Sequence, residues 1–345
     1  MLKSIGLFVF TPLILIGCAN HPADASENSG QALTHAKGAI LRAEGAKALS
    51  LLSKVDETNL SPEDLAFLNC ATERLSDAES APIPDLSSDL AREILPLFRT
   101  YWTKSIMDSE GRHDAERELG RQLSKLLEVD DPDQIEPMMI ERLESDGLHV
   151  LMGRTGRLRE LMIWQTQREE VQRVELPEST VNSTVYYLDD FVSTGWSSYF
   201  SCNNLGTGGW AKSDGLYVVV PQWESLDDER FRVSLLAHES QHFHDYSKFP
   251  DLVGWELEYR AKLVELALAD ASQAHLLRRF AVNQSNDEEE AHSFANRMVV
   301  SNLRAHLRLE AGEPLESRST SAIQTAAADL LKQDTQERQK KYATE

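Results

Sequence analysis

Hydrophobic residues in the first half of the chain recur every three or four positions, with polar residues between them. This spacing is typical of helices that bury one face against a core. It predicts helices over residues 31–55, 61–75, 88–107, 114–127 and 132–143. Ser61 followed by Pro62 marks a helix start, because serine caps free N–H groups and proline suits the first turn. The sequence therefore predicts an α-helical region over residues 31–147, whose apolar stripes are explained by core packing.

The pattern changes after Gly147, where short β-rich stretches replace the helical spacing. They predict strands over residues 148–152, 161–176, 181–199 and 216–220, although the alternation in 161–176 also suits a helix. Helical spacing returns over residues 225–249, 251–271, 288–309 and 320–331. Separate blocks of strands and helices indicate an α+β fold. We therefore expect a second region over residues 148–333, followed by a charged tail, residues 334–345, that frays from the last helix.

The N-terminus has the layout of a secretory signal. Lys3 supplies a positive charge, and the apolar stretch over residues 5–16 is too short to span a membrane as a helix. The stretch ends in Leu-Ile-Gly-Cys, with the cysteine at position 18, and resembles a bacterial lipobox. That resemblance implies removal of residues 1–17, lipidation of Cys18 and a place on the outer membrane facing the periplasm. The alternative is an ordinary secretory signal with a chance cysteine. Residues 18–30 are polar and are expected to form a flexible tether.

The charge and the cysteine content of the chain limit the partners and the cellular compartment that we expect. The formal net charge is −21, and acidic residues are spread along the chain, which argues against nucleic acid as a partner. Besides Cys18 the chain has Cys70 and Cys202. In an oxidising envelope compartment they would form a disulfide, worth up to about 4–5 kcal/mol by loop closure. The alternative is two buried free thiols.

The strongest chemical signal is the sequence His238-Glu239-Ser240-Gln241-His242, which reads H-E-x-x-H. In a helix its two histidines lie one above the other, and both continue the hydrophobic stripe of Phe231 and Leu235. Two imidazoles at this spacing can bind one Zn²⁺, and Glu239 can then act as the general base. The sequence therefore predicts a zinc site on the buried face of this helix.

A third ligand is expected from the next helix. Asp245 lies ~10 Å along the first helix from His238, too far for both residues to bind one ion. It is expected to hydrogen-bond a metal ligand or to stabilise the end of the helix. Glu258 is favoured because small residues flank it on its own face and allow close helix approach. Glu256 is the alternative, although Arg260 one turn on predicts an exposed ion pair for it. Glu265 lies on the same face as Glu258 and is expected to support the ligands.

These residues carry a resemblance to the gluzincin class of zinc metallopeptidases. The resemblance implies a zincin-like fold, Zn²⁺ held by His238, His242 and Glu258, and an edge strand near Gly208 and Gly209 that binds extended peptide. The candidate hydrogen-bond donors to the reacting carbonyl are His292, Tyr199 and Tyr217. The chain departs from the class at Lys262, where an acidic residue is usual.

The sequence as a whole therefore predicts a lipid-anchored zinc metallopeptidase of the bacterial envelope. Glu239 and His292 are the expected catalytic residues, and the expected partners are a peptide or protein substrate and the membrane that holds the lipid. Two alternatives remain open. One is a non-catalytic binding or assembly lipoprotein on a zincin-like scaffold, and the other is an amidase that cleaves cell-wall peptides.

Overall fold

The computed structural model describes residues 25–77, 82–84, 86–212 and 214–342. The expected signal peptide and the lipidation site Cys18 lie outside these residues. The chain divides into two compact units. Among the described residues, we call those in 25–167 and 188–207 the N-terminal unit, and those in 168–187 and 208–342 the C-terminal unit. The division does not fall at Gly147, as the sequence pattern suggests, because the strands that follow it are shared between the units.

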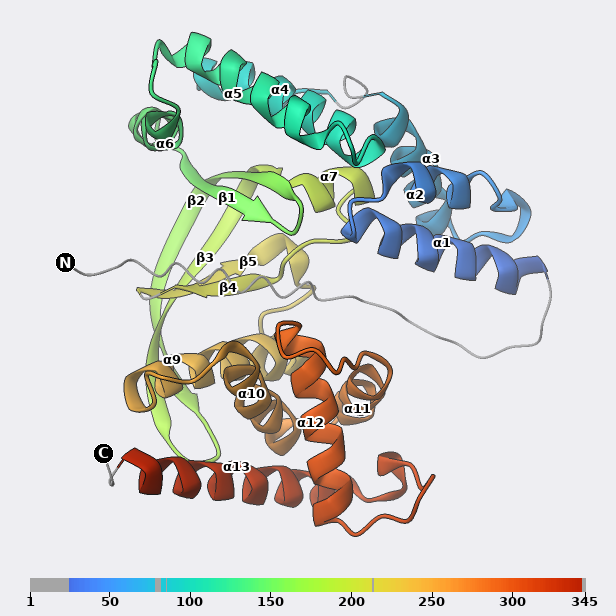
Figure 1. Cartoon of the computed structure of the whole chain (residues 1–345), viewed down its shortest axis with the longest axis vertical. Helices are drawn as coiled ribbons and strands as arrows, with labels where there is room; N and C mark the ends of the chain where they lie inside the picture. Colours follow the sequence, from blue (N-terminus) through green and yellow to red (C-terminus); the bar gives the residue numbers. More distant parts are fainter. Residues whose placement is uncertain (1–24, 78–81, 85, 213, 343–345) are drawn as a thin grey trace. The chain divides into compact units, whose positions relative to one another are not determined.

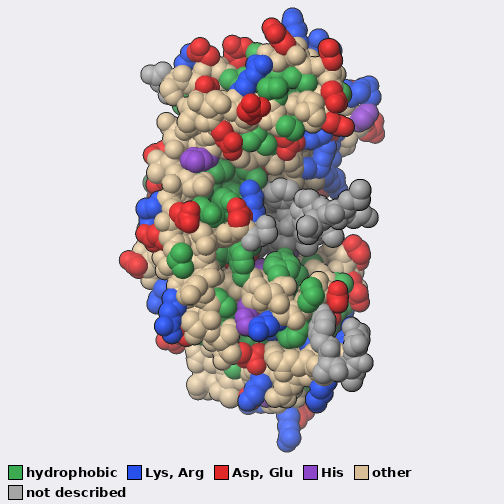
Figure 2. Space-filling view, turned by 90° about the vertical axis from the view of Figure 1, so that its left-hand side faces the viewer, with side chains coloured by type: hydrophobic (Ala, Val, Ile, Leu, Met, Phe, Trp, Pro, Cys, Tyr) green, Lys and Arg blue, Asp and Glu red, His purple; other side chains and the backbone are tan. Residues whose placement is uncertain are grey.

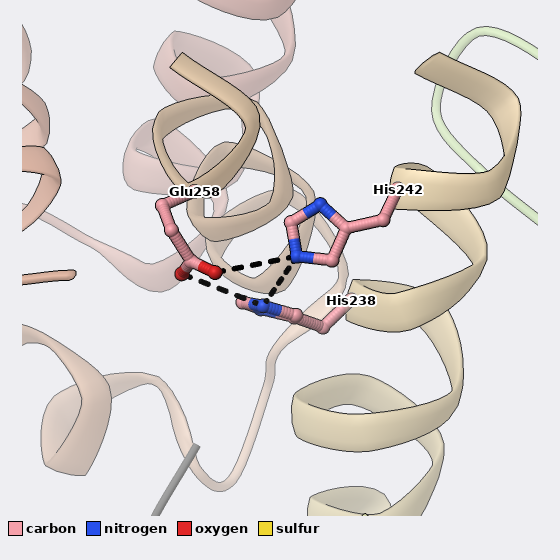
Figure 3. A group of neighbouring side chains, drawn as sticks. All are labelled: His238, His242 and Glu258. Carbon is pink, nitrogen blue, oxygen red and sulfur yellow. Dashed lines mark hydrogen bonds and ion pairs between the residues drawn. The ribbon is translucent and has the colours of Figure 1, made fainter. Parts of the chain in front are cut away.

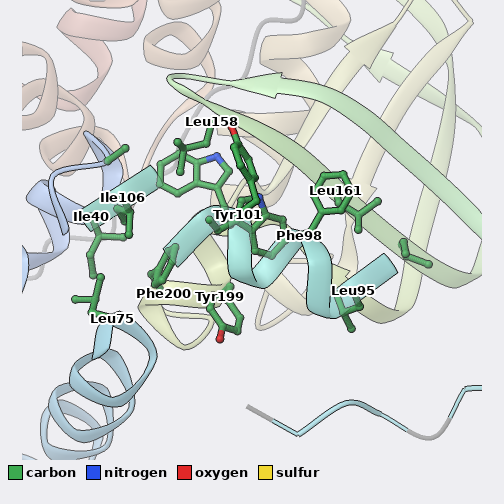
Figure 4. Packing of buried hydrophobic residues seen from close by; sticks show 14 of the residues in the cluster. Ile40, Leu75, Leu95, Phe98, Tyr101, Ile106, Leu158, Leu161, Tyr199 and Phe200 are labelled. Atoms are coloured by element: carbon green, nitrogen blue, oxygen red, sulfur yellow. The ribbon is translucent and has the colours of Figure 1, made fainter. Parts of the chain in front are cut away.

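The N-terminal unit is mainly helical, as predicted (Figure 1). Its helices are α1 Ala25–Leu41, α2 Gly45–Leu52, α3 Pro62–Ser76, α4 Asp89–Met107, α5 Arg112–Leu127, α6 Ile135–Ser145 and α7 Trp196–Ser201, with short 3-10 turns η1 Glu57–Asn59 and η2 Pro132–Gln134. The Ser61 hydroxyl accepts a hydrogen bond from the Asp64 N–H, which confirms the predicted cap. Figure 4 shows how Phe98 and Tyr101 of α4 pack beside Leu158 and Phe200 in the core of this unit.

The beginning of the chain differs from its prediction in two places. The expected helix over residues 31–55 is two helices, because Ala43 has a left-handed φ of 55° and ends the first one. The expected tether extends to Gly30, whereas α1 already begins at Ala25. Ser29 is buried there, and its hydroxyl accepts a hydrogen bond from the Asp56 N–H at 3.1 Å. This tertiary contact, which local composition does not reveal, fixes the start of the helix.

Cys70 and Cys202 form a disulfide in the N-terminal unit. The bond joins α3 to the residue that follows α7, and it spans 132 positions of sequence. Both partners belong to the same unit, so the crosslink restricts how far that unit can expand when it unfolds.

Five strands form one sheet in the order β1-β2-β3-β5-β4. The strands are β1 His149–Thr155, β2 Leu158–Glu175, β3 Thr180–Thr194, β4 Gly209–Lys212 and β5 Gly215–Val219. The sheet confirms residues 161–176 as strand rather than helix. The predicted strand over 181–199 is too long, because Gly195, with a φ of 91°, ends β3 and α7 follows. The distal parts of β2 and β3, residues 168–187, belong to the C-terminal unit.

The C-terminal unit packs its helices around α10 (Figure 1). Its helices are α8 Glu229–Phe231, the π-helix η4 Arg232–Ala237, α9 His238–Lys248, α10 Gly254–Leu268, α11 Gln273–Val282, α12 Ala291–His306 and α13 Thr320–Tyr342, with 3-10 turns η3 Val220–Gln222 and η5 Leu315–Ser317. Leu263 and Val264 of α10 meet Val299 of α12 and Ile323 of α13 in one buried cluster. Helices and a separate sheet confirm the α+β class.

Two predictions for this unit need correction. The helix that carries the histidines starts after Asp228, not Ser225, because the Asp228 carboxylate accepts the Phe231 N–H at 2.7 Å. The expected frayed tail from residue 334 is the last part of α13. Asp334 and Arg338 stay ordered in the helix because they form ion pairs with each other and with residues of α10.

The surface carries both signs of charge. On the face shown in Figure 2, acidic and basic side chains are interspersed rather than gathered by sign. Within the described part of the chain, no helix is both long enough and apolar enough to cross a membrane.

One buried acid in the N-terminal unit stands out. Glu160 of β2 is buried, and its Oε1 accepts the N–H groups of Leu161 and Trp196, both at 3.1 Å. A side chain at position 195 would clash with this carboxylate, which explains the glycine there. Burial raises the pKa of Glu160 to about 7. The folded state therefore favours the protonated acid, and its contribution to stability declines as the pH rises from the unfolded pKa through about 7.

Glu160→Gln should remove this pH dependence. A glutamine keeps the accepting oxygen but cannot ionise, so the variant should lose less stability than the wild type between about pH 5 and about pH 8, by about 2–3 kcal/mol. Urea unfolding followed by tryptophan fluorescence measures the difference. Glu141→Gln, on an exposed face of α6, is the control and should follow the wild type. Parallel pH profiles for Glu160→Gln and the wild type would contradict the assignment.

Candidate metal centre

The helix over residues 229–248 presents its histidines to the interior. Its buried stripe runs through Phe231, Leu235, His238 and His242, as the sequence predicts. The segment before His238 is a π-helix, which the sequence pattern does not reveal. From the adjacent strand, Ser183 of β3 meets Ser240 with 2.9 Å between their hydroxyl oxygens, in a buried contact. Strand and helix packing therefore fixes the rotation of α9 about its axis.

His238, His242 and Glu258 converge on one point between α9 and α10 (Figure 3). The two Nε2 atoms lie 3.2 Å apart. Glu258 Oε1 is 3.3 Å from Nε2 of His242, and its Oε2 is 3.6 Å from Nε2 of His238. All three side chains are buried. The structure therefore brings together the three residues that the sequence selects as ligands.

This cluster fits a bound cation. Ligands ~2.0–2.1 Å from a tetrahedral ion lie ~3.3 Å from one another, close to the separations seen here. The cluster also contains buried polar atoms, which proteins seldom leave without a hydrogen-bond partner. Neither oxygen of Glu258 has an aligned hydrogen bond, although both oxygens have ion-pair contacts, and His242 Nδ1 has no aligned hydrogen bond either. Nitrogen and oxygen lone pairs that converge at ligand spacing are the features of a metal site, so these residues could hold a metal ion.

Glu265 orients the ring of His238 through Nδ1, the ring nitrogen that does not face the cluster. Its Oε1 lies 2.7 Å from Nδ1 of His238, and its Oε2 is 3.2 Å from the Arg279 guanidinium. Burial opposes ionisation of Glu265, but Arg279 and His238 outweigh it and lower the pKa to about 2. Burial likewise opposes protonation of His238, yet Glu258 and Glu265 raise the pKa of its imidazole to about 10. A carboxylate on Nδ1 leaves Nε2 directed at the cluster, which is the supporting arrangement expected for a metal-binding histidine.

Glu239 lies in the same buried region, with only 2% of its surface exposed. Burial raises the pKa of its carboxyl group, while the nearby His242 and His238 partly counteract the rise. A raised pKa makes the ionised form of a carboxyl group a stronger base, which favours the role of general base.

His292 also reaches the cluster. Its Nδ1 lies 2.7 Å from Oε2 of Glu258, and 31% of its side chain is exposed. It comes from the first turn of α12, more than thirty positions along the chain from Glu258. His292 therefore joins the buried ligands to the surface of the C-terminal unit.

The two tyrosines considered with His292 are engaged elsewhere. Tyr199 packs against Trp102 and Phe200 in the core of the N-terminal unit. The Tyr217 hydroxyl donates to Asp214 at 2.7 Å. Sequence reasoning missed Tyr246, which follows His242 by one helical turn and has 47% of its surface exposed. Its position four residues after the second histidine was the available signal, because i and i+4 share a face.

Glu256 lies outside the cluster of His238, His242 and Glu258, and the predicted ion pair with Arg260 was wrong. Its carboxylate accepts the Val253 N–H at 3.0 Å and pairs with Arg338, whereas Arg260 is buried against Asp245 at 2.8 Å and Asp334 at 2.6 Å. The predicted exposed pair of Glu256 and Arg260 fails because α13 covers this side of α10. Asp245 thus supports α10 instead of the ligands.

The glycines before the histidine helix have packing roles. A side-chain carbon at Gly208 would lie 2.6 Å from the Trp223 ring, and one at Gly209 would lie 2.5 Å from the Tyr217 carbonyl oxygen. β4, which begins at Gly209, is the last strand of the sheet order and is paired with β5. The glycines are therefore required by contacts within the unit, whether or not β4 binds peptide.

Comparison with known proteins returned no matching family model, no matching curated protein and no matching solved structure. The case for the site therefore depends on the chain's own residues.

The choice between the two glutamates is testable by metal binding. Glu258→Ala should weaken Zn²⁺ affinity at least about a hundredfold, because it removes a residue that binds the metal directly and not just one that hydrogen-bonds a ligand. Glu256→Ala is the matched control on the same helix and should bind Zn²⁺ like the wild type. Competition with a fluorescent chelator measures both affinities. The reverse order of effects would reassign the third ligand to Glu256.

Proposed function

We propose that this protein is a zinc-dependent metallopeptidase with a zincin-like catalytic unit. The observation that carries the proposal is the buried convergence of His238, His242 and Glu258 with Glu239 beside them. Two histidines and one glutamate are a known donor set for catalytic zinc, which keeps a fourth position open. A bound zinc ion would act as a Lewis acid that polarises a peptide carbonyl and acidifies water.

The chain's own residues supply the proton transfers. Glu239 takes a proton from the attacking water and returns it to the leaving amine. Its carboxyl group suits this exchange, because burial raises its pKa and makes its ionised form a stronger base. Glu265 keeps the His238 ring in one orientation throughout, since it is itself held by Arg279.

Negative charge develops on the carbonyl oxygen of the substrate during attack, and a hydrogen-bond donor is needed to stabilise it. Two side chains could provide that donor. His292 contacts Glu258 through Nδ1, and its side chain is partly exposed, so its second ring nitrogen is free of that contact. Tyr246 is half exposed, and burial together with the charges of Glu239 and Glu258 raises the pKa of its hydroxyl, which keeps the hydroxyl protonated as a donor. Both residues are better situated for this role than Tyr199 or Tyr217.

The proposed setting is the bacterial envelope, with the protein held by lipid at Cys18 and facing the periplasm. The lipobox-like N-terminus supports this placement. The disulfide between Cys70 and Cys202 fits it as well, because such bonds persist in oxidising compartments. The proposed substrates are peptides or proteins of that compartment.

Glu239→Gln tests the reaction directly. We expect the variant to bind Zn²⁺ with wild-type affinity, because residue 239 is not a ligand, and to lose at least about a hundredfold in hydrolysis. Release of amines from an unfolded protein and from cell-wall peptides should be measured side by side. Cleavage of cell-wall peptides alone would identify an amidase.

Wild-type activity in Glu239→Gln would exclude Glu239 as the base. Zinc binding without cleavage of either substrate by the wild type would favour the non-catalytic alternative. Glu256→Gln provides the same chemical change outside the cluster and should leave hydrolysis unchanged.

A further inference from the structure

A lysine lies inside the ligand cluster. Lys262 follows Glu258 by one turn of α10, so both side chains share a face, and its Nζ is 3.3 Å from Oε2 of Glu258. Lys262 is only 4% exposed, and its ammonium group lies over the ring of Phe280, 5.1 Å from the centroid. A buried ammonium group needs a carboxylate partner, because desolvation without one costs several kcal/mol. Glu258 is that partner.

The two oxygens of Glu258 have different surroundings. Oε2 is contacted by Lys262 at 3.3 Å and by His292 Nδ1 at 2.7 Å. Oε1 has the closer approach to a ligand nitrogen, 3.3 Å to His242, whereas Oε2 is 3.6 Å from the ring of His238. Oε2 therefore faces donors from α10 and α12 as well as His238, whereas Oε1 faces His242.

The two buried glutamates of α10 each form an ion pair with a different cation. Glu258 has Lys262, and Glu265 has Arg279 at 3.2 Å. Each of these two carboxylates thus has its own cation. Because each cation neutralises a carboxylate that faces the site, the net negative charge available to a bound dication is smaller than two glutamates alone would supply.

We propose that Lys262 is a positioning residue: together with His292 it holds Oε2 of Glu258, so that Glu258 binds the metal ion through Oε1 alone. The inference rests on the proposed metal centre and adds how its third ligand is controlled. Monodentate binding matters because a catalytic site of three protein ligands needs an open fourth position. A second oxygen from Glu258 would crowd that position and, beside a bound water, would raise the number of ligands from four to five.

Cobalt provides a readout that does not depend on activity. Co²⁺ bound by four ligands absorbs visible light more strongly than Co²⁺ bound by five. In the full chain, Lys262→Met should weaken the visible bands, because Glu258 is then free to bind with both oxygens. It should also raise Co²⁺ affinity about tenfold, because a nearby positive charge is removed. Lys332→Met, the same change at an exposed position of α13, is the control and should match the wild type.

The outcomes separate the inference from the proposed function. If the wild type binds no Co²⁺ or Zn²⁺, both fail. If the wild type binds metal but Lys262→Met leaves the bands and the affinity unchanged, only the role of Lys262 is overturned.

A crystal structure of the zinc-loaded full chain decides the matter even if Lys262→Met does not fold. Oε1 should lie ~2.0–2.2 Å from zinc, with Oε2 beyond bonding distance and beside Lys262. Two oxygens of Glu258 at bonding distance would overturn the proposal.

Discussion

The C-terminal unit is organised around the cost of burying charge. Glu258 and Glu265 are almost wholly buried between helices, where an unpaired carboxylate would be strongly destabilising. Their charges are balanced by Lys262, by Arg279 and by the histidines between them. Burial forces these groups to pair, and the pairing directs the ligand atoms toward one point. A metal ion would complete that balance, since it supplies positive charge where oxygen and nitrogen lone pairs converge.

The same constraint shapes the rest of the unit. α10 is covered by α9, α12 and α13, so its polar residues must find partners on each of those helices. Arg260 illustrates this, because it joins Asp245 of α9 to Asp334 of α13. The charged end of the chain is therefore part of the folded unit. It holds α10, and thereby Glu258, against the histidine helix.

Local signals in the sequence predicted a large part of this structure. The capped helices, the long strand β2 and the buried stripe of His238 and His242 all follow from periodicity and capping, which act within a few residues. The choice of Glu258 also depended on a local feature, its small neighbours on α10. Glu265 could be placed behind the ligands for the same reason, because seven residues return to one helix face.

What the sequence did not reveal depends on contacts between distant segments. The spacing of four residues predicts an ion pair between Glu256 and Arg260. The pair does not form because α13 covers α10, which no local pattern indicates. The end of β3 depends on Gly195, which follows that strand and lies beside Glu160 of β2. His292 was a weak candidate by sequence and lies against Glu258 only through the packing of α12. Lys262 first looked like a departure from the gluzincin pattern, and the fold shows it paired with a predicted ligand.

The central claim is that His238, His242 and Glu258 together bind one zinc ion. The most direct test is the metal content of the purified full chain, measured by plasma mass spectrometry beside His242→Ala. The account predicts about one zinc ion per wild-type chain and a large loss in the variant, which keeps only two of the three ligands. A wild type that remains free of zinc after incubation with the metal, or a variant that retains all of it, would contradict the account.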